Sequence, residues 1–169
     1  MVLETYPDAC FVQTHRDLGR VLPSICSLVT GWRGLYEGEV NPHAIGGWQL
    51  EMWAEMMERG IQQRRAADPA HFFDLHFRDV VDDPVGAVKR LYHHFGFELG
   101  EEAERRMRAW LAENPQGKHG GHRYAPEEFG LDDDAMAERF AAYLEHFQVE
   151  REAASWPSTP PIAKDPRSV

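Results

Sequence analysis

Hydrophobic residues follow two kinds of pattern along the chain, one typical of strands and one typical of helices. Residues 10–14 and 71–77 are short apolar runs rich in residues that favour strands. Elsewhere apolar residues recur every three or four positions, which predicts five helices. These helices are expected over about 17–29, 44–66, 84–95, 101–113 and 132–147. Strands separated by helices are the pattern of an α/β protein.

Acidic residues mark the starts of three of these helices. Asp17, Asp83 and Asp132 each stand just before a helical run, where a carboxylate can accept hydrogen bonds from the first backbone N–H groups. Pro84 follows Asp83 at the first helical position, where its missing N–H has no cost. The acidic run 132–134 therefore needs no ligand to explain it.

Two segments between the helices are rich in glycine. Residues 31–47 are expected to form a loop, and residues 114–130 an ordered loop that also carries histidines. Within the helix at 44–66, the Met and Trp stripe from Trp48 to Met57 is expected to be core rather than an acceptor pocket. The helix at 101–113 is expected to turn Met107, Trp110 and Leu111 inward.

Composition limits the class of protein. Hydrophobic residues make up 43% of the 169, and the formal net charge is −10, which disfavours wholesale disorder and binding to nucleic acid or anionic membranes. Cys10 and Cys26 form no disulfide framework and no zinc motif. The sequence has no apolar run of membrane-spanning length and no signal-peptide pattern at its start. A cytoplasmic protein is expected.

The predicted domain organisation is one incomplete domain followed by a tail. Residues 1–150 are expected to fold as a partial domain, because two strands do not make an independently stable parallel sheet. Residues 151–169 are expected to be disordered, since the last fourteen contain four prolines without periodicity. An uncovered strand edge would favour self-association.

The most specific candidate site is Arg16, which follows the first predicted strand and precedes a helix start. Open α/β sheets bind anions at this place, and a guanidinium matches two oxygens of a phosphate. Ser24 lies about two turns along the helix and could donate a hydroxyl to the same anion. Spacing alone leaves a second interpretation open, in which Arg16 pairs with Asp17 or another carboxylate and Ser24 has no special role.

Several motifs together resemble the PAPS-dependent sulfotransferase family, especially its bacterial branch. They are Tyr6-Pro7-Asp8-Ala9, Thr14-His15-Arg16-Asp17 with Val21-Leu22-Pro23-Ser24, Phe77-Arg78-Asp79 with Asp83-Pro84, and the segments 114–124 and 128–131. The resemblance covers most of residues 5–148. It implies the C-terminal portion of a three-layer parallel sheet similar to that of P-loop kinases, here rich in helix.

The resemblance also implies a function and site residues. The family transfers a sulfuryl group from 3′-phosphoadenosine 5′-phosphosulfate (PAPS) to a hydroxyl or amine of a small molecule or glycan, without a metal. Arg16 and Ser24 match the positions that hold the 3′-phosphate, and Phe77 matches a residue beside the adenine. Lys118, His122 and Arg123 match the loop that closes over the phosphate.

The sequence departs from the family in four ways. Leu18 stands where proline is usual, Phe77 where tyrosine is common, and Lys118-His119-Gly120 where an Arg-Lys-Gly core is usual. The Gly/Ser/Thr-rich loop that holds the 5′-phosphosulfate is absent, as are a GxxxxGK[ST] motif and a recognisable catalytic base. We therefore expect a truncated sulfotransferase that is inactive by itself.

The sequence offers two other functions and one metal site as alternatives. In a non-catalytic helical interaction module, Arg16 and Lys118 would be surface residues without a role in nucleotide binding. A nucleotide phosphotransferase is disfavoured because the sequence has no phosphate-binding loop. His119 and His122, three residues apart without a nearby carboxylate or thiol, are a weak metal motif. No metal is expected.

Overall fold

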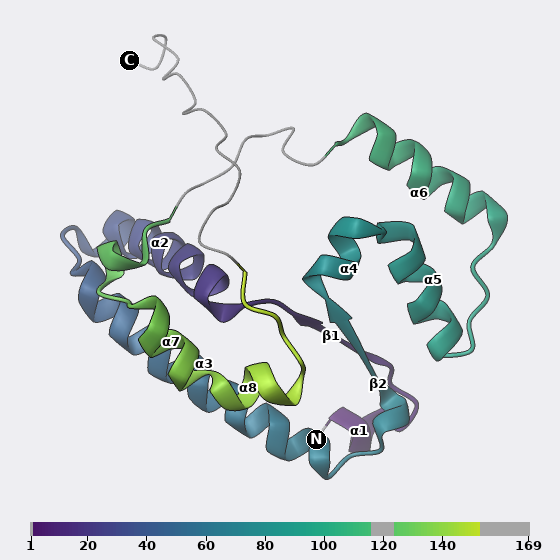
Figure 1. Ribbon diagram of the computed structural model, residues 1–169, viewed down its shortest axis with the longest axis horizontal. Coiled ribbons are helices and arrows are strands. Elements are labelled where there is room, and N and C mark those ends of the chain that lie inside the picture. The colour runs from purple at the N-terminus through teal and green to yellow at the C-terminus, as the bar shows by residue number, and fades with distance from the viewer. Residues whose placement is uncertain (1, 116–123, 153–169) are drawn as a thin grey trace.

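The structure is a computed structural model that describes residues 2–115 and 124–152 (Figure 1). In these ranges its elements, in chain order, are α1 (Val2–Thr5), β1 (Phe11–His15), α2 (Leu18–Glu37), α3 (Pro42–Arg65), η1 (Pro69–His71), β2 (Phe72–His76), α4 (Phe77–Asp82), α5 (Pro84–His94), α6 (Glu101–Glu113), η2 (Pro126–Phe129), α7 (Asp133–Arg139) and α8 (Ala141–His146). The described part is therefore an α/β fold rich in helix, as predicted.

The two strands pair in parallel in the middle of the molecule. Their register places Phe11 beside Phe72 and His15 beside His76. Helices α2 and α3 form the connection between them, so the pair is a β–helix–β unit of the kind that the sequence predicted. The helices α2, α3, α7 and α8 lie to one side of the strands in Figure 1, and α4, α5 and α6 lie to the other.

The main core joins α2 and α3 to the C-terminal helices. It consists of Leu18, Leu22, Cys26, Ile45, Ala54, Ile61, Phe129, Leu131, Met136, Phe140, Tyr143, Phe147 and Val149. The helical pattern at 132–147 predicts one buried stripe of Met136, Phe140, Tyr143, Leu144 and Phe147; Leu144 is partly buried and the other four are buried. The single predicted helix at 132–147 is divided at Phe140 into α7 and α8.

The predicted loop at residues 31–47 is mostly helix. Helix α2 runs on through Gly31 and Gly34 to Glu37, and Gly38, with a φ of 80°, ends it. Each glycine costs a helix about 1 kcal/mol relative to alanine. The packing of the first half of α2 and an Arg33–Glu37 ion pair one turn apart offset that cost.

The predicted buried face of α3 was right in part, and that of α6 was wrong. In α3, Trp53 and Met57 pack against the core. Trp48 is 60% exposed and Met56 50% exposed, because the face turned to the core carries Ile45, Gln49 and Ile61. In α6, none of the residues is buried, and Trp110 is 61% exposed. Within residues 2–115 and 124–152, the main contact of helix α6 is with α5.

Candidate functional site

The carboxyl ends of the two strands bring two of the predicted site residues together. Because His15 and His76 are register partners in a parallel pair, the residues that follow them, Arg16 and Phe77, leave the sheet at the same edge. The guanidinium carbon of Arg16 lies 3.8 Å from the centre of the Phe77 ring. This is a cation–π contact between residues that are 61 positions apart in the chain.

The guanidinium of Arg16 also holds a carboxylate. Its Nε donates to Glu152 Oε1 at 2.7 Å and its Nη2 to Glu152 Oε2 at 2.9 Å. Two parallel N–H···O bonds are the geometry in which arginine binds carboxylates and phosphates. Pairing with a carboxylate is one of the two interpretations that the sequence left open, but the partner is Glu152 rather than the adjacent Asp17.

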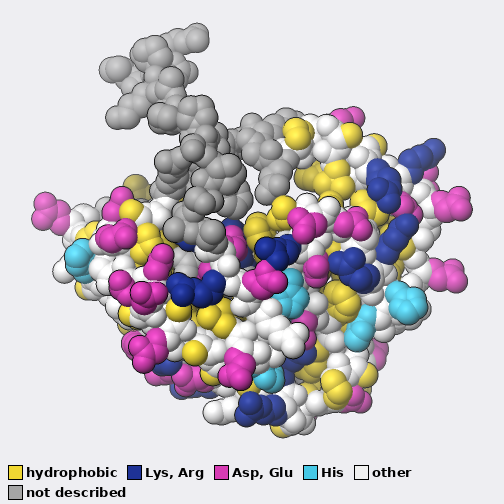
Figure 2. All heavy atoms as spheres, in the orientation of Figure 1, with side chains coloured by type: hydrophobic (Ala, Val, Ile, Leu, Met, Phe, Trp, Pro, Cys, Tyr) yellow, Lys and Arg dark blue, Asp and Glu magenta, His cyan; other side chains and the backbone are white. Residues whose placement is uncertain are grey.

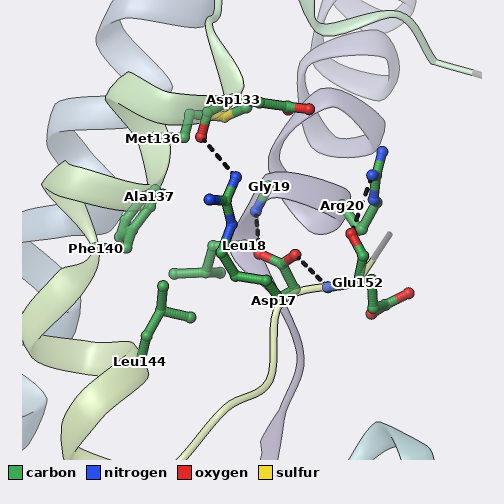
Figure 3. Close-up of a pocket in the computed structure, with 11 residues that line it drawn as sticks. Asp17, Leu18, Gly19, Arg20, Asp133, Met136, Ala137, Phe140, Leu144 and Glu152 are labelled. Atoms are coloured by element: carbon green, nitrogen blue, oxygen red, sulfur yellow. Dashed lines mark hydrogen bonds between the residues drawn. The ribbon is translucent and has the colours of Figure 1, made fainter. Parts of the chain in front are cut away.

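The backbone at this edge is fixed by Asp17, the predicted N-cap of α2. Its Oδ1 accepts from Gly19 N at 2.9 Å, and its Oδ2 accepts from Glu152 N at 2.8 Å (Figure 3). Arg20, one turn along, donates from Nη2 to Glu152 O at 3.1 Å. The start of α2 and the segment that ends at Glu152 are therefore tied together by both side-chain and backbone groups.

A buried polar network lies beneath Arg16. His15 is 1% exposed; its Nε2 lies 2.8 Å from Asp74 Oδ1, and its Nδ1 lies 3.1 Å from the Tyr143 hydroxyl. A neutral imidazole that donates to Asp74 and accepts from Tyr143 satisfies both contacts. The Tyr143 oxygen in turn hydrogen-bonds the backbone of Arg16. The chain Asp74–His15–Tyr143 therefore ends on the residue that carries the guanidinium.

Arg64, near the end of α3, completes this network. Its Nη2 donates to Asp74 Oδ2 at 2.9 Å, its Nη1 pairs with Asp74 Oδ1, and Nη1 also donates to Gln13 Oε1 at 3.0 Å. Gln13 lies in β1 and Asp74 in β2, and the two are register partners. Arg64 thus links β1 and β2 near their carboxyl ends, where Arg16 follows β1.

Burial and hydrogen bonding shift the pKa values of this network. Burial lowers the pKa of His15 below its ordinary value of 6.5, although the bond to Asp74 opposes that shift. Burial alone would raise the pKa of Asp74, but hydrogen bonds from Arg64 and His15 outweigh it and hold the pKa below 3.8. Burial raises the pKa of Tyr143 to about 12. The network therefore contains a neutral His15 and an ionised Asp74 at neutral pH.

A cavity of about 340 Å³ opens beside the start of α2 (Figure 3). It is lined by Asp17, Leu18, Gly19, Arg20, Asp133, Met136, Ala137, Phe140, Leu144, Arg151 and Glu152. The helices α7 and α8 supply its apolar wall, and the backbone around Glu152 forms its edge. Arg16 is not among the residues that line this cavity.

Surface charges elsewhere are mixed in sign. On the face shown in Figure 2, Lys and Arg side chains lie among Asp and Glu side chains. Exposed ion pairs one turn apart within helices include Arg33–Glu37, Arg59–Glu55 and Arg106–Glu102. This arrangement offers no broad basic surface on that face, so an anion would depend on individually placed residues.

The remaining predicted site residues are less defined. Ser24 lies in α2 and is partly buried. Lys118, His122 and Arg123, and the His119 of the metal motif, lie outside the described residues, so their proposed roles stay predictions. In residues 2–115 and 124–152, no three His, Cys, Asp or Glu side chains gather as a metal site, and no helix there is long and apolar enough to cross a membrane.

Sequence reasoning missed five residues of this site: His15, Arg64, Asp74, Tyr143 and Glu152. An aspartate inside an apolar strand indicates a buried polar partner, so the position of Asp74 could have pointed to this network. Glu152 gave no signal, since it lies in the predicted tail.

Comparison with known proteins identifies the family of this chain. The family model described as Sulfotransferase family matches residues 1–101.

The chain belongs to the sulfotransferase family. It is 26% identical over 147 residues to the omega-hydroxy-beta-dihydromenaquinone-9 sulfotransferase Stf3 of Mycobacterium bovis and of Mycobacterium tuberculosis. That alignment covers 85% of this chain and 37% of each relative. The sequence therefore spans little more than a third of the length of these relatives.

Solved structures of sulfotransferases have a similar fold. The crystal structure of sulfotransferase STF9 from Mycobacterium avium matches with a TM-score of 0.78 and 28% identity, over 88% of this chain and 38% of that one. Sulfotransferase STF1 from Mycobacterium tuberculosis H37Rv matches with a TM-score of 0.70 and 32% identity, over 83% and 35%. These matches confirm the predicted family and disfavour the interaction module.

Proposed function

We propose that this chain forms the 3′-phosphate side of a PAPS-dependent sulfotransferase, which transfers a sulfuryl group from PAPS to a hydroxyl or amine. In the proposed fold it is the C-terminal portion of a larger parallel sheet of the P-loop-kinase type. One observation carries the proposal: the fork of Arg16, at the carboxyl end of β1, binds a two-oxygen anion bidentately. A phosphate presents the same pair of oxygens.

The proposed roles follow from position. Arg16 grips the 3′-phosphate, and Ser24 donates a hydroxyl from the flank of α2. One face of the Phe77 ring contacts the Arg16 guanidinium, and in the proposed complex the adenine lies beside Phe77. Lys118, His122 and Arg123 approach the phosphate from the loop before η2. In the present structure the Glu152 carboxylate binds the Arg16 fork, which supports the fit of the Arg16 donors to an oxyanion.

The 5′-phosphosulfate and the acceptor need groups that these 169 residues do not offer. The sequence contains no GxxxxGK[ST] motif and no Gly/Ser/Thr-rich loop after a first strand. Sulfuryl transfer requires donors for the charge that develops on the leaving phosphate and a base for the acceptor. We therefore infer that the chain by itself does not turn over PAPS. A hydroxyl acceptor is supported by the Stf3 relatives, whose name describes an omega-hydroxy compound.

A ligand series tests the proposal directly. The thermal midpoint of the purified chain is measured with 3′-phosphoadenosine 5′-phosphate (PAP), with adenosine 5′-monophosphate and with ATP. Binding to the native state raises the midpoint, so PAP is expected to raise it more than either nucleotide that lacks a 3′-phosphate. An equal shift with adenosine 5′-monophosphate, or a shift with ATP alone, contradicts the 3′-phosphate site.

A further inference from the structure

The segment from Val149 to Glu152 crosses the edge of the sheet where Arg16 leaves it. Glu152 is fixed there through three groups: its carboxylate on Arg16, its N–H on Asp17 and its carbonyl on Arg20. The side chains of Arg16 and Glu152 are 30% and 28% exposed. The ion pair is thus partly shielded from water, and its backbone contacts give it one defined position.

The end of α8 directs the segment to this position. Gln148 adopts a φ of 53°, and it is the one residue other than glycine with a positive φ in the described ranges. Its N–H donates to Glu145 O at 3.3 Å, and the Val149 N–H donates to Leu144 O at 2.9 Å. These two bonds form a Schellman motif, in which glycine is usual at the left-handed residue. The left-handed backbone of Gln148 is therefore locally strained.

The contacts of Glu152 and those of a phosphate on the Nε–Nη2 edge of Arg16 exclude each other. A guanidinium that donates Nε–H and one Nη–H to a carboxylate has used this edge. One face of the guanidinium plane lies over the Phe77 ring. A phosphate therefore reaches the same edge of Arg16 only after the Glu152 carboxylate has left it.

We propose that Glu152 is an intramolecular latch that competes with the 3′-phosphate for Arg16, an inference that rests on the proposed function. In the latched state the carboxylate neutralises the guanidinium and holds its fork in the geometry an anion needs. Nucleotide binding releases the latch, and residues 149–152 swing away on the Gln148 turn. The apparent affinity for the nucleotide is then reduced by the fraction of molecules in which the latch is open.

The test measures the dissociation constant of PAP by titration calorimetry for the chain and for three variants. Glu152→Gln removes the charge at nearly constant shape, and Glu152→Ala removes the contact altogether. Glu150→Gln is the matched control, because Glu150 lies two residues away and pairs with Arg78 at an exposed site, so the change in net charge is the same. Both Glu152 variants are expected to bind PAP about fivefold more tightly, the upper range for a partly exposed ion pair, and Glu150→Gln to bind like the parent chain.

The outcomes separate the latch from the proposed function. If the parent chain and both Glu152 variants bind PAP equally, or if the variants bind more weakly, the 3′-phosphate site stands and the latch is overturned. If Glu150→Gln gains as much affinity as Glu152→Gln, net charge explains the gain and the latch is again overturned. If none of the four proteins binds PAP while each melts cooperatively, the proposed function fails and the latch fails with it.

Discussion

The guanidinium of Arg16 and the ring of Phe77 are stacked at 3.8 Å where two parallel strands end side by side. This contact holds the guanidinium against the ring while its Nε and Nη2 bind Glu152. The same contact places the Phe77 ring close to any anion that binds the Arg16 guanidinium. A phosphorylated nucleoside has both of the parts that such a pair can recognise.

Arg16→Ala is expected to weaken PAP binding by about 1.5–3 kcal/mol, because a hydrogen bond to a charged group is lost. Titration calorimetry with PAP measures the change. Arg33→Ala is the control, since Arg33 lies in α2, the helix that begins after Arg16, and pairs with the exposed Glu37. Unchanged PAP affinity in Arg16→Ala removes this residue from the site.

Phe77→Leu is expected to lower PAP affinity by about 0.5–1 kcal/mol, the size of an exposed cation–π contact. Phe77→Tyr keeps a ring of the same shape and is expected to retain the affinity of the parent chain. The comparison uses dissociation constants for PAP at one salt concentration. A loss in the tyrosine variant as large as in the leucine variant would show that the ring is not the feature that matters.

Gly46→Ala tests the contact that anchors η2, the element that follows the proposed phosphate loop. A Cβ at Gly46 would stand 2.0 Å from the carbonyl oxygen of Phe129. Backbone cannot yield cheaply there, so a loss of about 1–3 kcal/mol in unfolding free energy is expected. Gly47→Ala is the control, because nothing lies within 4 Å of its Cβ, and helix propensity predicts a gain of about 0.5–1 kcal/mol. Urea unfolding measures both; equal stabilities would contradict the contact.

Stability is expected to fall as the pH drops from 7 to 5, in part through His15. Its pKa is lowered by burial, so below pH 6.5 the unfolded chain takes up a proton that the folded chain refuses. Acidification thus favours the unfolded state until the folded pKa is reached. Asp74 acts at lower pH, since its lowered pKa means that its stabilisation is lost as the pH falls through that value.

Thermal midpoints measured from pH 7 to pH 5 check this prediction with two variants. His15→Gln is expected to show a shallower decline than the parent chain, because the linked proton is gone. His93→Gln, at an exposed position of α5, is expected to decline as steeply as the parent. A parallel decline in all three proteins would mean that His15 does not contribute to the acid sensitivity.

Local signals in the sequence predicted the frame of this site. Asp17, Asp83 and Asp132 cap helices because a short carboxylate before an apolar run has few other roles. Arg16 stood out because a strand before it and a helix after it define an anion-binding position. Phe77 was predicted only through resemblance, and the meeting of the two side chains follows from a parallel register that the sequence does not state.

Features that depend on distant contacts were not predictable in this way. The Asp74–His15–Tyr143 network joins two strands and α8. His15 is 59 positions from Asp74 and 128 positions from Tyr143, and no local sequence pattern predicts contacts over such separations. Gly31 and Gly34 indicated a loop because glycine has a low helix propensity, which is a local property. The packing of α2 on α3 instead stabilises the helix. Trp48 was predicted as core from periodicity, which does not tell which side of a broad apolar face finds a partner.

The decisive measurement is a crystal structure of the chain with PAP. We expect the 3′-phosphate on the Nε and Nη2 edge of Arg16, the Phe77 ring still against the guanidinium, and the Glu152 carboxylate displaced from it. PAP bound at another place, with the Arg16–Glu152 pair intact, would contradict the proposed 3′-phosphate site.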